Sequence, residues 1–319
     1  MFTRKFSMLI VSVVLLLLGS CGGSGSDGVV VTQTPPQANA AALPITAVNA
    51  QDITVTVLGA IVSTIDIVDI LDIIDPGDVG GTIPGLAKFA VNAIFPRTVP
   101  CDTGVAAVEW NDADNNLVVS TGDTFDIVFD MCFLQDTGTT LDGPTSITDL
   151  VVTGDPFQIA PWVLELTFGF DNLSGTDSTG TVIVDGDVSL DYSSDDNIVE
   201  NILITTASLT TQYDGITQTL SDYVLAQTFD VNALTLVLSA NGTLTSSLLE
   251  GSVTFETLED FTGTFDDNPS TGQLLISDPS SSVLVTVLDN ISVQLDIDFD
   301  LDGTIDETIV VTWAELDID

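Results

Sequence analysis

The sequence predicts an all-β protein: a large antiparallel meander that forms an open barrel or a sandwich, with one or two short helices near the N-terminus. Three observations lead to this fold class. Apolar and polar residues alternate in short stretches from residue 101 to the C-terminus. Turn signals separate these stretches at intervals of roughly 8–15 residues, and no helical pattern lies between them, which favours antiparallel pairing. Each strand also has one apolar face and one face of Asp, Thr or Ser, so the sheet must curl or pack on a partner.

The first twenty residues have the pattern of an export signal. Arg4 and Lys5 precede an uncharged apolar run over residues 8–18, which is too short to span a bilayer comfortably. Residues 18–21 read Leu-Gly-Ser-Cys, and small residues directly before a cysteine resemble the lipobox of bacterial lipoproteins. In that family the signal is cut before the cysteine, so the resemblance implies that Cys21 is acylated. The alternative is an ordinary secretory signal that happens to be followed by a cysteine.

The next segment, residues 21–50, is expected to be a flexible tether because it contains the runs GGSGSDG and TQTPPQANAAA. Residues 51–319 then form a single β-rich domain. Its first part is ambiguous: residues 52–57 alternate like a strand, whereas acids at three-residue spacing across residues 61–74 suit a helix. Residues 84–95 (PGLAKFAVNAIF) are the best helix candidate, and we expect this helix to pack against the sheet.

The strands themselves are expected from period-two alternation. Residues 125–133 and 164–170 show the pattern clearly, and the last hairpin is expected within residues 293–313. Two dipeptides are expected to be turns between strands. They are Asp185-Gly186 and Asn241-Gly242, and the second is a strong hairpin signal.

The charge balance is extreme. The chain has 47 acidic residues, four basic residues and no histidine, which gives a formal net charge of −43. If Arg4 and Lys5 leave with the signal, only Lys88 and Arg97 oppose the acids, and the mature chain carries −45. Such a field repels nucleic acid and anionic headgroups, so neither is an expected partner. Adaptation to a salty medium and binding of divalent cations both explain the acidity, and composition does not separate them.

The remaining two cysteines, Cys101 and Cys132, are expected to form a disulfide because an exported protein meets an oxidising compartment. Two buried free thiols are the alternative.

The sharpest candidate site is an acidic run near the C-terminus. Residues 298–305 (D-x-D-x-D-G-x-I) fit the first eight positions of a calcium-binding EF-type loop. The fit fails at position 12, where Ile309 stands in place of the bidentate glutamate. The alternative to a calcium site is a solvent-exposed hairpin. A second acidic turn, residues 111–116, is interpreted as a plain turn. The candidate calcium ligands are Asp298, Asp300, Asp302, Asp306 and Glu307.

Enzymatic function is not expected. The absence of histidine removes Ser-His and Cys-His pairs, and no phosphate-binding or dinucleotide fingerprint occurs. A glycosidase needs only two carboxylates, but among 47 acids no pair is informative. The sequence therefore gives no catalytic residues.

Several features from Cys101 onward carry a resemblance to a known group. They are the spacing from Cys101 to Cys132, the segment Pro-Ser-Thr-Gly at residues 269–272, and the closing DxDxDGTxD followed by Trp313. These features resemble a group of acidic proteobacterial lipoproteins of unknown function. The resemblance implies a lipid anchor, a disulfide and an all-β body, and supplies no activity. Gly22 after the acylated cysteine implies sorting to the outer membrane.

The function expected from these features is that of a lipid-anchored envelope lipoprotein acting as a non-enzymatic structural or binding module. Its partners are the membrane, through the N-terminal lipid, and an envelope protein, a glycan or an apolar ligand. Two alternatives stay open: a calcium-dependent surface or adhesion module, and a carrier of a lipid or other apolar ligand.

Overall fold

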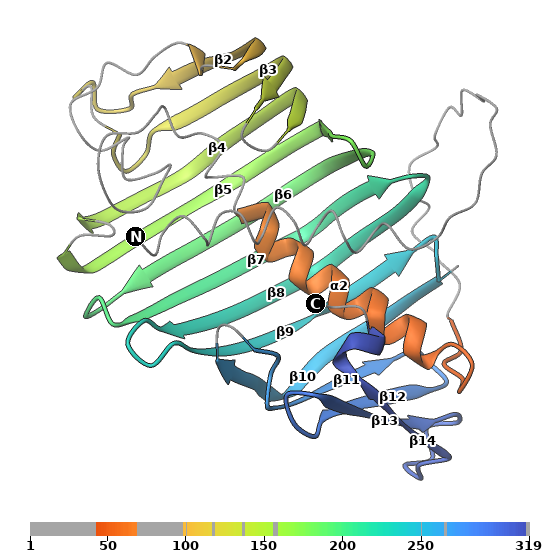
Figure 1. Ribbon diagram of the computed structural model, residues 1–319. Coiled ribbons are helices and arrows are strands. Elements are labelled where there is room, and N and C mark those ends of the chain that lie inside the picture. The colour runs from red at the N-terminus through yellow and green to blue at the C-terminus, as the bar shows by residue number, and fades with distance from the viewer. Residues whose placement is uncertain are drawn as a thin grey trace.

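The computed structural model describes residues 43–68, 98–99, 101–116, 119–135, 138–155, 159–249, 251–264 and 267–316. The all-β prediction is confirmed. Fourteen strands form one antiparallel sheet in which every strand pairs with its neighbours in sequence (Figure 1). The first and last strands lie at opposite ends of this order, so the sheet is not closed.

One α-helix, α2 (Ala50–Val68), and a final 3-10 turn, η3 (Trp313–Leu316), accompany the sheet. The strands are β1 (Thr98–Val99), β2 (Thr103–Asn111), β3 (Thr124–Leu134), β4 (Thr139–Asp155), β5 (Ile159–Thr176), β6 (Thr181–Ser194), β7 (Val199–Tyr213), β8 (Ile216–Asp230), β9 (Thr235–Ser246), β10 (Gly251–Thr264), β11 (Thr271–Ser277), β12 (Ser282–Val287), β13 (Ser292–Asp298) and β14 (Glu307–Thr312).

The strands are longer than the turn signals predict. Asp185-Gly186 lies inside β6 and Asn241-Gly242 lies inside β9, so both expected turns are wrong. At Gly186 the backbone has φ of 122° and a Cβ would overlap the Ser208 carbonyl oxygen, so the glycine permits a register shift instead of a chain reversal. Similar shifts occur between most neighbouring strands, and such bulges bend a strand and increase its twist.

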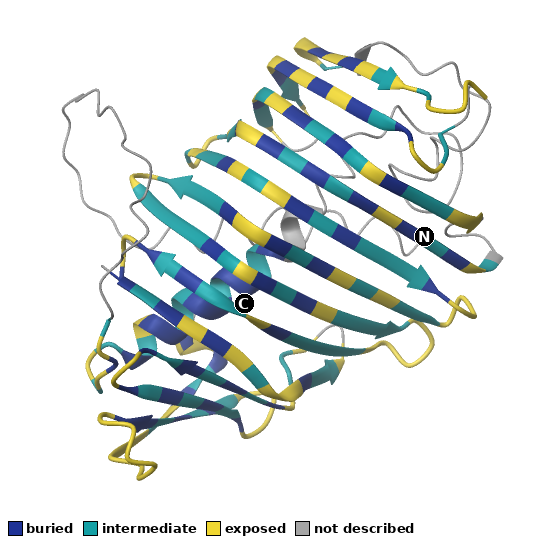
Figure 2. Ribbon diagram, turned by 180° about the vertical axis from the view of Figure 1, so that it is seen from behind, coloured by how far each residue is buried: buried dark blue, intermediate teal, exposed yellow. Residues whose placement is uncertain are grey.

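The sheet has two unlike faces. We call the face that carries α2 the inner face and the opposite face the outer face. Apolar side chains alternate onto the inner face, where the buried residues form one core cluster. Figure 1 shows α2 lying across the middle strands while β10 to β14 turn toward it, and Figure 2 shows the same sheet from the outer side.

The helix α2 begins earlier than expected and replaces the strand expected at residues 52–57, so that strand prediction is wrong. The buried residues Ile53, Val57, Ala60, Ile61 and Thr64 recur at helical rather than alternating spacing. The helical prediction is confirmed for residues 61–68. Residues 69–74 and the helix expected at residues 84–95 lie outside the described residues.

Polar groups on the buried side of α2 are satisfied locally and by the sheet. The Thr54 hydroxyl donates to the Ala50 carbonyl oxygen at 2.8 Å. The Thr64 hydroxyl donates to the Ile61 carbonyl oxygen at 2.7 Å and lies 2.7 Å from the Tyr223 hydroxyl of β8. These bonds allow a Thr-rich, β-branched segment to be buried as a helix. Within the described residues, no helix has both the length and the hydropathy needed to cross a bilayer.

The folded part begins before the boundary expected at residue 50. Ile45 is 1% exposed, and its backbone N–H donates to the Ser281 hydroxyl at 2.6 Å. The Asn49 side chain reaches back to accept the Thr46 N–H at 2.7 Å, and the Ala50 N–H donates to the Thr46 carbonyl oxygen at 2.9 Å, so Thr46 marks the start of the helical segment. The end of the segment assigned to the tether is therefore part of the fold, because an apolar residue there completes the core.

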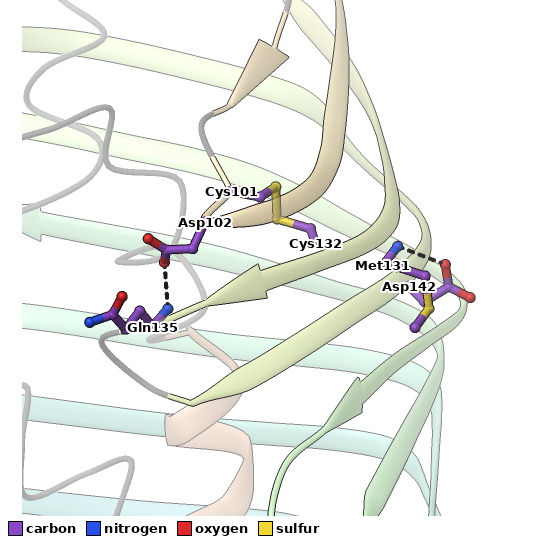
Figure 3. Close-up of a disulfide and its surroundings, with 6 residues drawn as sticks. All are labelled: Cys101, Asp102, Met131, Cys132, Gln135 and Asp142. Atoms are coloured by element: carbon purple, nitrogen blue, oxygen red, sulfur yellow. Dashed lines mark hydrogen bonds between the residues drawn. A yellow bond between two sulfur atoms is a disulfide. The ribbon is translucent and has the colours of Figure 1, made fainter.

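The disulfide prediction is confirmed. Cys101, just before β2, is bonded to Cys132 on β3, with 5.2 Å between their Cα atoms. Figure 3 shows the bond beside two further links: the Gln135 N–H donates to Asp102, and the Met131 N–H donates to Asp142. These contacts fix the start of the sheet near its first edge.

Removing this disulfide is expected to destabilise the sheet. In the chain-entropy model, closing a loop of about 31 residues contributes roughly 3–4 kcal/mol. The double variant Cys101→Ser/Cys132→Ser is therefore expected to lower the free energy of unfolding by about that amount, measured by urea denaturation. Cys21→Ser is the matched control and is expected to leave the stability unchanged; equal stability of both variants would contradict the prediction.

Candidate functional site

Two groups of three carboxylates converge in loops of the described sheet. One consists of Asp298, Asp300 and Asp306, and the other of Asp112, Asp114 and Asp123. In each group one oxygen per residue lies within 4.8 Å of the others. We call them the β13–β14 triad and the β2–β3 triad, after the strands that their loops connect.

The β13–β14 triad is built by a tight loop after β13. Asp298 is the last residue of β13 and is 7% exposed. Its two carboxylate oxygens accept the N–H of Asp300 at 3.2 Å and the N–H of Gly303 at 2.9 Å. Gly303 has φ of 83°, which allows the chain to turn back toward Asp298.

Asp306 closes the same loop from its other end. Its carboxylate accepts the Phe299 N–H at 2.8 Å, and its own N–H donates to the Ile297 carbonyl oxygen at 2.9 Å. The loop therefore returns to the end of β13, and this return places Asp306 beside Asp298 and Asp300.

The environment of Asp298 favours its charged form. Partial desolvation acts to raise its pKa, but N–H groups of Gly303, Asp300, Leu301 and Asp302 outweigh this effect and hold the pKa below its usual value of 3.8. The carboxylate is thus ionised over the whole neutral range, as a metal ligand must be.

The structure groups three of the five predicted ligands. Asp302 lies outside the triad and accepts the Thr304 N–H at 2.7 Å, which is a turn contact. Glu307 also lies outside it, because it already belongs to β14 and pairs with Ile297. Ile309, at the twelfth position, pairs with Leu295 deeper in the same ladder.

The β2–β3 triad is organised by one buried carboxylate. Asp123 is 0% exposed, and it accepts the N–H groups of Ala113 at 2.9 Å and Ser120 at 3.0 Å. The indole N–H of Trp110 also donates to it, at 3.1 Å. Because these three donors come from both ends of the loop, Asp123 holds the loop that carries Asp112 and Asp114 close to the start of β3.

The sequence analysis missed this second triad because it interpreted residues 111–116 as a plain turn. A spacing signal was present: counted from Asp112, positions 1, 3, 5, 9 and 12 of an EF-type loop are Asp112, Asp114, Asn116, Ser120 and Asp123. Position 6 carries Leu117 in place of the usual glycine, which is why the motif is hard to recognise.

Other acidic turns in the described residues are simpler. Asp196, for example, accepts the N–H groups of Ile198 at 2.8 Å and Val199 at 2.9 Å, and these bonds lower its pKa. This arrangement is an ordinary Asx turn. The two triads differ from it because several carboxylates share one loop.

Among the described residues, no cationic side chain neutralises the carboxylates of these loops. All four basic residues lie outside the described residues, and the sequence has no histidine. Backbone N–H groups and neutral side chains therefore supply the described contacts of these carboxylates, and oxygen-rich loops of this kind suit hard cations such as calcium. Acidic clusters that could bind a metal are thus a feature of the fold.

Comparison with protein-family models, with curated proteins and with solved structures finds no match to this chain. The fold and the two triads therefore carry the functional argument by themselves.

Replacing Asp298 is expected to make stability less dependent on acidic pH. Because its folded pKa lies below the unfolded value of 3.8, its contribution is present above that value and is lost as the pH falls through the lowered pKa. The melting temperature of the wild type should exceed that of Asp298→Asn at pH 7, and the difference should narrow below about pH 4. A difference that stays constant down to about pH 2 would contradict this assignment.

Proposed function

We propose that this protein is a lipid-anchored protein of the bacterial outer membrane whose folded part is a non-enzymatic structural or binding module. The observation that carries the anchor is the sequence Leu-Gly-Ser-Cys at residues 18–21. The first described residue, Leu43, lies well beyond Cys21, so a spacer of GGSGSDG and TQTPPQANAAA separates the lipid site from the fold. Such a spacer holds a domain away from the membrane.

The outer face of the sheet supports a binding role. Hydroxyl side chains face one another across neighbouring strands, as in Thr167–Ser189 at 3.0 Å and Thr210–Thr219 at 3.0 Å. Together with the exposed acids, these pairs make an extended surface rich in hydrogen-bonding groups. A surface of this kind suits a polar partner, namely an envelope protein or a glycan.

The anchor is tested by the variant Cys21→Ser, expressed with its signal in a Gram-negative bacterium. Wild-type chain should fractionate with the outer membrane and carry the mass of added acyl chains, whereas Cys21→Ser should lose both properties. Ser20→Ala keeps a small residue before the cysteine and is the matched control. Membrane recovery of Cys21→Ser equal to that of the wild type would exclude this anchor.

Calcium-dependent behaviour is a second candidate function, and the two carboxylate triads favour it. The β13–β14 triad supplies positions 1, 3 and 9 of an EF-type loop, and the β2–β3 triad supplies positions 1, 3 and 12. Bound calcium would neutralise carboxylates that no described side chain neutralises, and it would make both loops rigid. No described observation specifically favours a carrier of apolar ligands, so that alternative is not proposed.

Calcium at 10 mM is expected to raise the free energy of unfolding by about 1–3 kcal/mol for each triad that binds it, as follows from dissociation constants of roughly 0.1–1 mM. The measurement is a melting curve in EDTA, calcium or magnesium, each across a sodium chloride series. Two double variants should each lose part of the stabilisation that calcium produces. They are Asp298→Asn/Asp306→Asn and Asp112→Asn/Asp114→Asn.

The matched control is Asp195→Asn/Asp214→Asn, which removes the same charge from exposed turns outside the triads and should keep the whole effect. If sodium alone gives the same rise as calcium, the acids respond only to general screening and the second candidate is excluded.

A further inference from the structure

A pocket opens in the sheet where β9 and β10 separate. These strands pair at residues 251–253 with 244–246 and again at 261–264 with 235–238, with no pairing in between. In this gap the Thr257 hydroxyl takes the place of backbone hydrogen bonds between β9 and β10. It accepts the Ala240 N–H at 2.9 Å and donates to the Ala240 carbonyl oxygen at 3.0 Å. The resulting pocket has a volume of about 670 Å³, which is within the range of small-molecule sites.

The rim of this pocket carries three exposed carboxylates. Asp222 comes from β8, where a register shift and φ of 49° interrupt the regular strand. Glu256 and Asp260 come from β10, on the part of the strand that is separated from β9. Two register breaks in neighbouring strands therefore place acids around one hollow.

Between the acids, the lining combines hydroxyls, an amide and apolar surface. Leu275 lies directly across from Glu256 in the β10–β11 ladder, and Phe255 contributes to the lining. The polar lining residues are Ser239, Asn241, Thr243, Thr254 and Ser277. The three carboxylates are acceptors only, and no described residue of the chain is cationic, so a complementary ligand must bring positive charge and N–H donors.

We infer that this pocket binds a linear aliphatic polyamine. Ammonium groups supply three donors and no acceptor, and they match the separated carboxylates of Asp222, Glu256 and Asp260. The methylene chains between them pack on the side chain of Leu275, which is partly exposed at the pocket. This site is distinct from both triads and does not depend on the lipid anchor.

The test is calorimetric titration of the full chain with spermidine in about 150 mM sodium chloride, where long-range attraction by the net charge is screened. Wild-type protein should show one saturable site. The triple variant Asp222→Asn/Glu256→Gln/Asp260→Asn should weaken this binding about tenfold or more.

The matched control removes three acids from β3, β5 and β6, away from the pocket. Asp126→Asn/Glu165→Gln/Asp185→Asn has the same charge change, and these three residues are also exposed. It should change the dissociation constant by less than about twofold, because only distant, screened charges are lost. The inference would be overturned if both triple variants weakened spermidine binding equally, or if spermidine binding to the wild type never saturated.

A second variant tests the same pocket without removing acids. Leu275→Lys adds an ammonium group opposite Glu256, so it should abolish spermidine binding while keeping the melting temperature at or above that of the wild type. Leu275→Gln, which adds polarity but no charge, should retain measurable binding. Undiminished binding by a folded Leu275→Lys would place the polyamine elsewhere and overturn the inference.

Discussion

The structure depends on one constraint: a single continuous sheet with only one apolar face must keep that face out of water. The chain shields this apolar face from water in two ways. The helix α2 lies on the inner face, and the last strands turn toward it through register shifts (Figure 1). Thr64 of α2 and Tyr223 of the middle strand β8 join the helix to the sheet by a hydrogen bond of 2.7 Å within the buried layer. Without the helix, the inner surface of the middle strands would lose its cover.

The second constraint is charge. The chain has a net charge of −43, and none of its described side chains is cationic, so no described carboxylate pairs with a described cation. Backbone N–H groups bind the described carboxylates instead, as at Asp123 and Asp298, and at Asp298 they hold the pKa below its usual value. The same loops and the β9–β10 pocket present carboxylate oxygens that could hold cations, and both proposed binding functions start from this one electrostatic feature.

The sites could be predicted only where the ligands are close in sequence. Asp298 and Asp300 follow from the D-x-D-x-D-G run, and Asp306 follows from position 9. Glu307 failed as a predicted member because pairing with Ile297 commits it to β14. Asp123 was missed because it lies at the far end of its loop, and because Leu117 stands where the EF-type spacing has its usual glycine. The pocket depends on register breaks in two strand pairs, which leave no clear signature in the sequence.

The sequence by itself determined the all-β class, the sequential antiparallel order and the Cys101–Cys132 bond, because alternation and the oxidising compartment are local or compositional signals. Only the tertiary structure decided that residues 52–57 are helical. Their β-branched residues suit a strand, but burial at helical spacing against the sheet outweighs that preference. Tertiary structure also decided that Asp185-Gly186 and Asn241-Gly242 continue strands, since Asp185 and Gly186 pair with β7 and Asn241 pairs with β8, in ladders that a turn would break.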